Sequence, residues 1–210
     1  MNELLHNTIK TCLSTLRKEL LEEVIAYGRV KELEPHAFLV KQGQLVKDLP
    51  IVLEGTIKVF TQADDFQFLL YYIYPGATCI SSFAHLFGDQ GIAFSGTAEE
   101  RSQILLIPIQ KAREWVLKYP EFNALILNEY QKQYNDLLET ATQVICYNLE
   151  DRILTYLKTK TAISRSATLA ISHSDIATDL ATSREVVSRI LKKMEREKKI
   201  IQLGRQIKLL

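Results

Sequence analysis

Residues 171–194, ISHSDIATDLATSREVVSRILKKM, constrain this chain more than any other segment, because they contain two consecutive helix starts. Each start has a hydroxyl side chain followed three residues later by a carboxylate, the capping-box pattern, in Ser172 with Asp175 and Thr182 with Glu185. Apolar residues follow at helical spacing: Ile176, Ala177 and Leu180 in the first helix, and Val186, Val187, Ile190, Leu191 and Met194 in the second. The pattern predicts a helix-turn-helix whose second helix enters the DNA major groove. The alternative is an ordinary helical hairpin with a solvated charged face.

The segment that follows, KKIIQLGRQIKLL, adds a second signal for DNA binding. Two short apolar runs on either side of Gly204-Arg205 predict a β-hairpin, and a helix-turn-helix closed by a hairpin is a winged helix. Charge is also unevenly distributed, since residues 150–210 hold 13 Lys and Arg against 7 Asp and Glu, although the whole chain has a formal net charge of only +1. A basic C-terminal part is expected of a phosphate-binding face.

Ser183-Arg184-Glu185-x-x-Ser188-Arg189, together with the hairpin, resembles the DNA-binding domain of the cyclic-AMP receptor protein/Fnr (Crp/Fnr) superfamily of bacterial transcription regulators. The resemblance implies that Arg184, Glu185 and Arg189 read the bases of a TGA-containing half-site, with Ser188 as a candidate fourth contact. The chemistry agrees, because arginine can form two hydrogen bonds with guanine and glutamate can accept one from cytosine. The predicted DNA-binding residues are Ser183, Arg184, Glu185, Ser188, Arg189 and Lys192.

The N-terminal part predicts a β-domain preceded by a helix over residues 3–27. Short apolar runs between Val30 and Pro108 alternate with turns at Gly43, Gly55 and Gly76, as in a small barrel or jelly roll. The string VKQGQ…PIVLEGTIKVF…YYIYPGATC is similar to the cyclic-nucleotide-binding β-roll of the same superfamily. The resemblance therefore covers the whole chain and implies an α+β fold with a sensor domain (1–120), a dimerisation helix (121–148) and a winged helix (149–210).

The sequence departs from the superfamily where cyclic-nucleotide binders hold the phosphate. Those proteins have Gly-Glu after the Pro-Gly turn and Arg-Ser/Thr-Ala about ten residues later, but this chain has Gly76-Ala77 and no arginine between Ala84 and Glu100. A buried phosphate without a cationic partner is poorly compensated, so we do not expect cyclic AMP to bind. A small apolar or uncharged polar effector is the remaining possibility, and so is no ligand at all. The candidate lining residues are Cys79, Ser81, Ser82 and Phe94.

No resident cofactor is predicted. An iron–sulfur cluster needs four ligands, whereas the three cysteines, Cys12, Cys79 and Cys146, are far apart in the sequence. Haem is a minor alternative, because Cys79 and His85 lie in the region where a sensor would place an axial ligand. A cupin-like enzyme needs clustered histidine and glutamate ligands, and residues 30–108 hold only the distant His36 and His85. We therefore expect a regulator rather than an enzyme.

A long helix without Gly or Pro is predicted over Phe122–Asn148. Six residues form a heptad seam and are the predicted dimer interface: Leu127, Tyr130, Tyr134, Leu137, Ala141 and Val144. Leu138 and Ile145, beside the seam, are expected to pack on the β-roll; the alternative is that the whole stripe packs there. A two-fold homodimer would read a palindrome with two recognition helices. Beyond this helix we expect a helix over Leu149–Leu157 and an exposed loop over Lys158–Ala170.

The remaining expectations concern location and partners. The chain has no run of about 18 apolar residues, no basic-then-apolar leader and no paired cysteine spacing, which favours the cytoplasm. The expected partners are double-stranded DNA and a second copy of the chain, with no membrane. The resemblance adds RNA polymerase. An unidentified small-molecule effector is consistent with the sensor domain, and a regulator that needs no ligand is the alternative.

Overall fold

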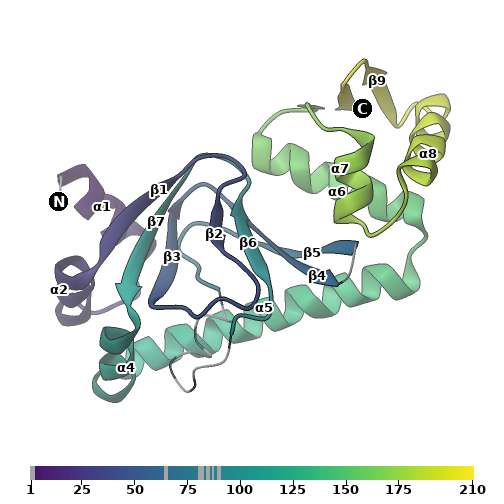
Figure 1. Ribbon diagram of the computed structural model, residues 1–210. Coiled ribbons are helices and arrows are strands. Elements are labelled where there is room, and N and C mark those ends of the chain that lie inside the picture. Colours follow the sequence, from purple (N-terminus) through teal and green to yellow (C-terminus); the bar gives the residue numbers. More distant parts are fainter. Residues whose placement is uncertain (1–2, 64–65, 80–82, 84–85, 87, 89–90) are drawn as a thin grey trace. The chain divides into compact units, whose positions relative to one another are not determined.

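The computed structural model describes residues 3–63, 66–79, 83, 86, 88 and 91–210 (Figure 1). The chain divides into two compact units. The first combines Met1–Thr61 with Leu70–Leu137, and the second combines Gln62–Leu69 with Leu138–Leu210. The fold is α+β, as predicted from the sequence.

Two short helices open the first unit where a single helix was predicted. α1 spans Glu3–Cys12 and α2 spans Lys18–Tyr27. The prediction failed between Cys12 and Lys18, where the chain turns and the Leu16 N–H donates to the Leu13 carbonyl, three residues back, at 3.0 Å. Leu13 and Leu16 are buried in this turn, at 1% and 8% exposure. The apolar residues of both helices and of the turn between them pack into one core.

The first unit contains two antiparallel sheets. One has the order β1-β7-β3, from Arg29–Leu33, Ser102–Pro108 and Asp48–Glu54. The other has the order β2-β6-β4-β5, and its strands are Phe38–Val40, Ser95–Ala98, Ile57–Ala63 and Phe66–Ile73. The predicted β-roll is confirmed, and Gly43, Gly55 and Gly76 all have positive φ. A Cβ at Gly55 would lie 2.3 Å from the Ser102 hydroxyl oxygen, so the tight turn before β4 requires glycine.

Helices α2 and α4 (Ile109–Lys118) are joined through one carboxylate. Glu23 accepts hydrogen bonds from Trp115 Nε1 at 2.6 Å, from Tyr119 Oη at 2.6 Å and from Lys118 Nζ at 2.5 Å. The bond from Lys118, followed by those from Tyr119 and Trp115, lowers the pKa of Glu23 to about 2. Trp115 is fully buried and packs edge-on against Phe122.

Helix α5, Pro120–Cys146, is the long helix predicted from the sequence. Its buried residues are Phe122, Ile126 and Gln133, all within the first unit. Gln133 is buried as a polar residue because its amide donates to the Thr78 carbonyl and to the Glu129 carboxylate. This polar contact helps to set which face of α5 lies on the β-roll.

The second unit is a small helical domain with a three-stranded sheet of order β8-β10-β9. Its helices are α6 (Leu149–Ser164), α7 (His173–Asp179) and α8 (Arg184–Arg196), and its strands are β8 (Thr168–Leu169), β9 (Ile200–Leu203) and β10 (Gln206–Leu209). The predicted loop over Lys158–Ala170 is wrong for residues 158–164 and 168–169, which lie in α6 and β8. Helix α6 continues to Ser164, because Lys160 is 9% exposed with its ammonium 5.4 Å from the Tyr156 ring centre, and this packing outweighs the low helix propensity of Ser and Thr.

Residues Gln62–Leu69, from the β4–β5 connection, also belong to the second unit. Gln67 Nε2 donates to Asp179 Oδ1 at 3.1 Å, and Phe68 forms a backbone bridge with Leu180. Tyr156 Oη donates to the other carboxylate oxygen of Asp179 at 2.8 Å. Asp179, which is 3% exposed, therefore joins helices α6 and α7 to this segment.

Candidate nucleic-acid interface

The two predicted helix starts differ in their capping. Ser172 and Asp175 form the complete capping box at α7, as predicted. At α8 the N-cap is Ser183 rather than Thr182, and its hydroxyl accepts from the Val186 N–H at 3.3 Å. The third residue of α8 is therefore Val186, so the reciprocal carboxylate bond predicted for Glu185 cannot form there.

The shifted cap makes Arg184 and Glu185 the first two residues of α8. The pKa of Glu185 is lowered, mainly by a hydrogen bond from its own backbone N–H and then by the Ser183 hydroxyl. Glu185 is thus held as a carboxylate, which can only accept hydrogen bonds. A carboxylate at the start of a recognition helix has the chemistry needed to accept from the cytosine amino group.

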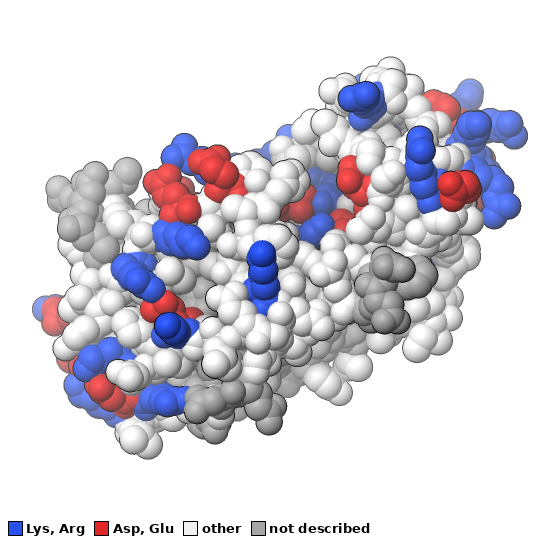
Figure 2. Space-filling model, in the orientation of Figure 1, with Lys and Arg blue, Asp and Glu red and all other residues white. Residues whose placement is uncertain are grey.

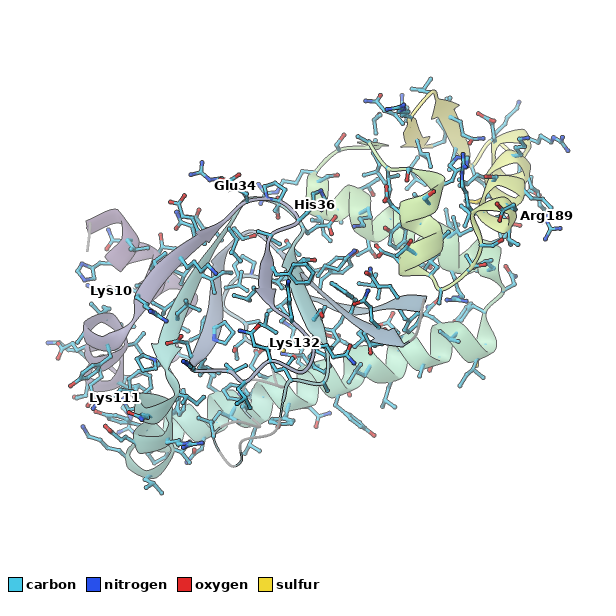
Figure 3. The ribbon with its side chains drawn as sticks, in the orientation of Figure 1. Lys10, Glu34, His36, Lys111, Lys132 and Arg189 are labelled. Carbon is cyan, nitrogen blue, oxygen red and sulfur yellow. The ribbon has the colours of Figure 1, made fainter. Side chains whose placement is uncertain are left out.

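Helix α8 has sharply different faces. Val187, Leu191 and Met194 are 0% exposed and fasten the helix to the core of the second unit. The opposite face carries exposed side chains, and Figure 3 shows Arg189 projecting away from the body of the domain. Lys and Arg side chains gather over this helix in Figure 2. The exposed members of the predicted DNA-binding set are Ser183, Arg184, Glu185, Arg189 and Lys192, and Ser188 is half-buried.

Ser188 is held in a network that the sequence did not reveal. His173 Nδ1 lies 2.8 Å from Ser188 Oγ, and His173 Nε2 lies 3.1 Å from Gln202 Oε1. Gln202 in turn donates from its side-chain Nε2 to Glu195 Oε2 at 2.9 Å. His173 therefore connects the start of α7 to α8 and to the hairpin. No spacing rule could have found this set, since its members are far apart in the chain.

Basic side chains from α8 and from the hairpin border the same hollow. Arg184 and Arg205 line a cavity of about 270 Å³ together with His173 and Gln202. The hollow lies where the starts of α7 and α8 meet the β9–β10 turn at Gly204, whose φ is +62°. The sequence placed Arg205 only in a turn, and its position in the same lining as Arg184 adds a cationic group from the hairpin to the candidate interface.

Of the two adjacent lysines of α8, Lys192 and Lys193, only Lys193 forms ion pairs among the described residues. Lys193 Nζ lies 2.7 Å from Glu150 Oε2, and Lys199 Nζ lies 2.7 Å from Glu150 Oε1. The two ammonium groups, Lys193 first, lower the pKa of Glu150 to about 2. Within the part of the chain that the structure describes, Lys192 forms no ion pair. Lys192 is thus the lysine of this pair whose charge is not matched inside the protein.

Two of the predicted effector-pocket residues lie together in the core of the β-roll. Cys79 is 7% exposed, with its Sγ 4.0 Å from Tyr71 Oη, and the Phe94 ring meets the Tyr71 ring edge-on with 6.1 Å between centres. Burial is the main cause that raises the pKa of Tyr71. Ser81, Ser82 and the alternative haem ligand His85 lie outside the described residues.

The residues of the predicted seam on α5 are mostly exposed. Leu137 is half-buried, and Leu138 and Ile145, which were not part of the seam, are exposed beside it. Leu127, Tyr134 and Val144 are 68%, 57% and 44% exposed, whereas Leu137 is half-buried against the β-roll core. Leu138 and Ile145 were expected to pack on the β-roll, but they are 49% and 81% exposed, so that prediction is wrong. The heptad pattern did not show that Gln133 lies on the buried face, which turns Leu138 outward. The exposed stripe consists of Leu127, Tyr130, Tyr134, Leu138, Ala141, Val144 and Ile145.

No three His, Cys, Asp or Glu side chains among the described residues are grouped as a metal site would require. No helix in the same residues combines the length and the apolar character needed to cross a membrane.

Comparison with known proteins agrees with this geometry. Residues 151–210 match the family of Crp-like helix-turn-helix domains. A Crp/Fnr-family regulator from Eubacterium rectale has a TM-score of 0.82 at 17% identity, with 94% of this chain and 92% of that chain covered. The c-di-GMP-responsive global regulator CLP of Xanthomonas campestris has a TM-score of 0.78 at 17% identity, covering 92% and 99%. A CRP-family regulator from Thermus thermophilus has a TM-score of 0.72 at 20% identity, with 86% of this chain and 91% of that chain covered. No curated protein matches the chain by sequence.

The match to residues 151–210 defines the class of the C-terminal domain, which is a helix-turn-helix domain. Residues 151–210 are a Crp-like helix-turn-helix domain, and the chain as a whole has the fold of the solved Crp/Fnr regulators named above. The resemblance drawn from the Ser183–Arg189 motif is thereby confirmed.

Proposed function

We propose that this regulator reads DNA sequence through the start of α8. The observation that carries the proposal is the pairing of a fully buried face, Val187, Leu191 and Met194, with an exposed polar face on one helix. Arg184, Glu185 and Arg189 are the base-reading residues, and Ser183 and Lys192 contact the backbone of the same half-site. Ser188 takes part mainly by holding α8 to His173.

Arg205 extends the proposed interface to the hairpin. It shares a hollow with Arg184 and comes from the turn between β9 and β10. A guanidinium there can bond a phosphate beside the groove that α8 enters. Its contribution would be to affinity and not to sequence preference.

The regulator is proposed to act as a homodimer on an inverted repeat. The exposed stripe of α5, from Leu127 to Ile145, offers apolar side chains at spacings of three and four residues, which suits a helix pairing with its own copy. Two recognition helices related by a two-fold axis read a palindrome. RNA polymerase as a partner and a cytoplasmic location remain predictions that follow from the class of protein.

We further propose an effector other than cyclic AMP. The Xanthomonas relative responds to c-di-GMP, so regulators with this fold are not restricted to one ligand. This chain has no arginine from Ala84 to Glu100 to pair a cyclic phosphate. A ligand-independent regulator is the second candidate, favoured by the close packing of Cys79 and Phe94 against Tyr71. We propose no haem or iron–sulfur cofactor, and the visible spectrum of the purified protein tests both.

The DNA-reading proposal is tested by selecting bound sequences from a random DNA library with the full-length protein. The expected result is an inverted repeat with TGA-like half-sites about two helical turns apart. The proposal is wrong if the selected DNA has no shared sequence, or if Arg184→Ala and Arg189→Ala select the same sequence as the unmodified protein.

A further inference from the structure

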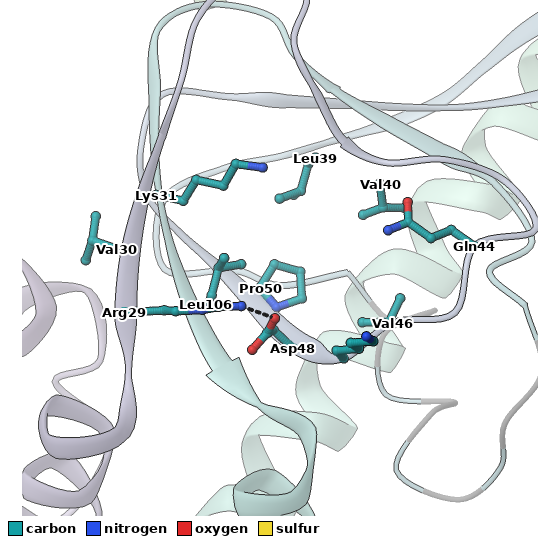
Figure 4. Close-up of a pocket in the computed structure, with 11 residues that line it drawn as sticks. Arg29, Val30, Lys31, Leu39, Val40, Gln44, Val46, Asp48, Pro50 and Leu106 are labelled. Atoms are coloured by element: carbon teal, nitrogen blue, oxygen red, sulfur yellow. Dashed lines mark hydrogen bonds and ion pairs between the residues drawn. The ribbon is translucent and has the colours of Figure 1, made fainter.

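A second hollow lies wholly within the first unit, away from Cys79 and Phe94. It has a volume of about 480 Å³ and is bordered by β1, β2, β3, β7 and the segment that joins β2 to β3 (Figure 4). Its apolar lining includes Leu39, Val40, Val46 and Leu106, each of them only partly buried. A cavity of this size is within the range of small-molecule sites, and its aliphatic side chains offer surface for an apolar group.

The charged residues around this hollow are not balanced. Arg29 Nη2 lies 2.5 Å from Asp48 Oδ2, and this pair, dashed in Figure 4, accounts for the carboxylate in the lining. Lys31 and Lys47 also line the hollow, and among the described residues neither makes an ion pair. Figure 4 shows Lys31 extending over the hollow toward Leu39. The lining therefore carries two positive charges that the protein does not neutralise.

A neutral donor lies on the other side of the same hollow. Gln44 Oε1 accepts a hydrogen bond from the Lys41 backbone N–H at 3.1 Å. This bond orients the side-chain amide, so that its NH₂ group, the donor half, faces the hollow in Figure 4. Ammonium and amide donors beside an aliphatic wall are the combination that recognises a carboxylate attached to an apolar body.

We propose that this hollow binds a small amphipathic carboxylate. The carboxylate is paired by Lys31 and Lys47, and the apolar body lies on Leu39, Val40, Val46 and Leu106. A cation of the same shape is disfavoured by the two unmatched ammonium groups, and an uncharged analogue loses the charge-assisted bonds. The proposal does not depend on DNA binding, because the site lies in the first unit and ligand binding is measured directly.

The test is calorimetric titration of the full-length protein with octanoate, below its micelle-forming concentration. Octan-1-ol and octylammonium serve as uncharged and cationic analogues of the same chain length. The expected result is saturable binding of octanoate, one per chain, and at least about tenfold weaker binding of both analogues. The double variant Lys31→Gln/Lys47→Gln is expected to weaken octanoate binding about tenfold.

The matched control is Lys10→Gln/Lys132→Gln, which removes the same charge from two exposed lysines outside the hollow (Figure 3). It is expected to bind octanoate like the unmodified protein. A second variant, Leu106→Gln, replaces a wall residue without changing charge and is expected to weaken octanoate as well, with its melting temperature measured to confirm folding. The proposal is overturned if octanoate does not saturate, if octan-1-ol binds equally well, or if the two lysine double variants behave alike.

Discussion

The imidazole Nδ1 of His173 lies 2.8 Å from the hydroxyl oxygen of Ser188, and this contact joins the first residue of α7 to the fifth residue of α8. The same hydroxyl donates to the Arg184 carbonyl oxygen at 2.8 Å, so it belongs to two bonds at once. Through Gln202, the imidazole also reaches the hairpin. The position of the proposed base-reading residues relative to the hairpin therefore depends on His173, which is not one of them.

Removing the His173 imidazole should loosen this arrangement. His173→Ala deletes two side-chain hydrogen bonds, and we expect it to lower the free energy of unfolding by about 1–3 kcal/mol. Urea unfolding of the full-length protein measures the change. Ser174→Ala, at the exposed neighbouring position, is the control and should change stability by less than about 0.5 kcal/mol. Equal stability of the two variants would show that the network contributes nothing.

Arg189 and Lys192 should affect DNA binding in different ways. Arg189→Ala is expected to cost roughly 1–3 kcal/mol on the selected sequence and to relax preference at one base position. Lys192→Ala is expected to weaken binding to all DNA sequences by a similar factor and to reduce the salt dependence of binding. Fluorescence anisotropy with the selected site and single-base variants of it, over a range of salt concentrations, separates the two. If Arg189→Ala weakened every sequence equally, its base-reading role would be wrong.

The exposed stripe of α5 should hold the dimer together. Leu127→Glu with Ile145→Glu introduces carboxylates at positions 68% and 81% exposed in the single chain, so the chain should still fold. In a dimer these charges would be buried without partners, at a cost of several kcal/mol, and we expect monomers in sedimentation velocity.

Leu117→Glu is the matched control for the dimer, because Leu117 is 91% exposed on α4, outside the stripe. It should leave the association state unchanged. Leu137→Glu is not a suitable variant, because Leu137 is half-buried against the core of its own chain. A monomer produced by that change could result from unfolding instead of from loss of the dimer interface. A Leu127→Glu/Ile145→Glu variant that remains dimeric would move the interface elsewhere.

Acid should weaken the packing of both units through Glu23 and Glu150. The pKa of each is lowered from 4.5 to about 2 in the folded chain, so folding favours the ionised form. Their contribution is complete above the unfolded pKa of 4.5 and is lost as the pH falls from there toward 2. We expect Glu23→Gln and Glu150→Gln each to lower the melting temperature at pH 7. Between pH 6 and pH 3, the melting temperature of each variant should fall by less than that of the unmodified protein. A parallel decline in all three proteins would contradict this assignment.

Cyclic AMP and cyclic GMP should not bind in the micromolar range. The stretch from Ala84 to Glu100 has no arginine to pair a cyclic phosphate, and desolvating an unpaired phosphate is unfavourable. Calorimetry with each nucleotide is the measurement, with octanoate as an independent ligand. Micromolar affinity for either nucleotide would show that other residues of this chain supply the missing charge.

The sequence by itself determined the features that depend on neighbours in the chain. The capping box at Ser172, the apolar stripe of α8, the hairpin at Gly204 and the glycine turns of the β-roll are local patterns, and the structure contains each of them. The motif from Ser183 to Arg189 was enough to indicate the class of the C-terminal domain, because a recognition helix needs particular residue types at particular spacings.

Only the tertiary structure decided features that depend on distant residues. A turn over Leu13–Leu16 divides the predicted first helix in two, and the burial of Tyr156 and Lys160 accompanies the extension of α6 through a stretch that was predicted as a loop. The face of α5 that contains Gln133 lies on the β-roll, and Leu138 and Ile145 are therefore exposed. The His173 network and the pairing of Glu150 with two lysines join residues 15 to 49 positions apart. Local periodicity reports the faces of one element, whereas these contacts depend on which elements meet, and that is settled by packing and hydrogen bonding across the whole domain.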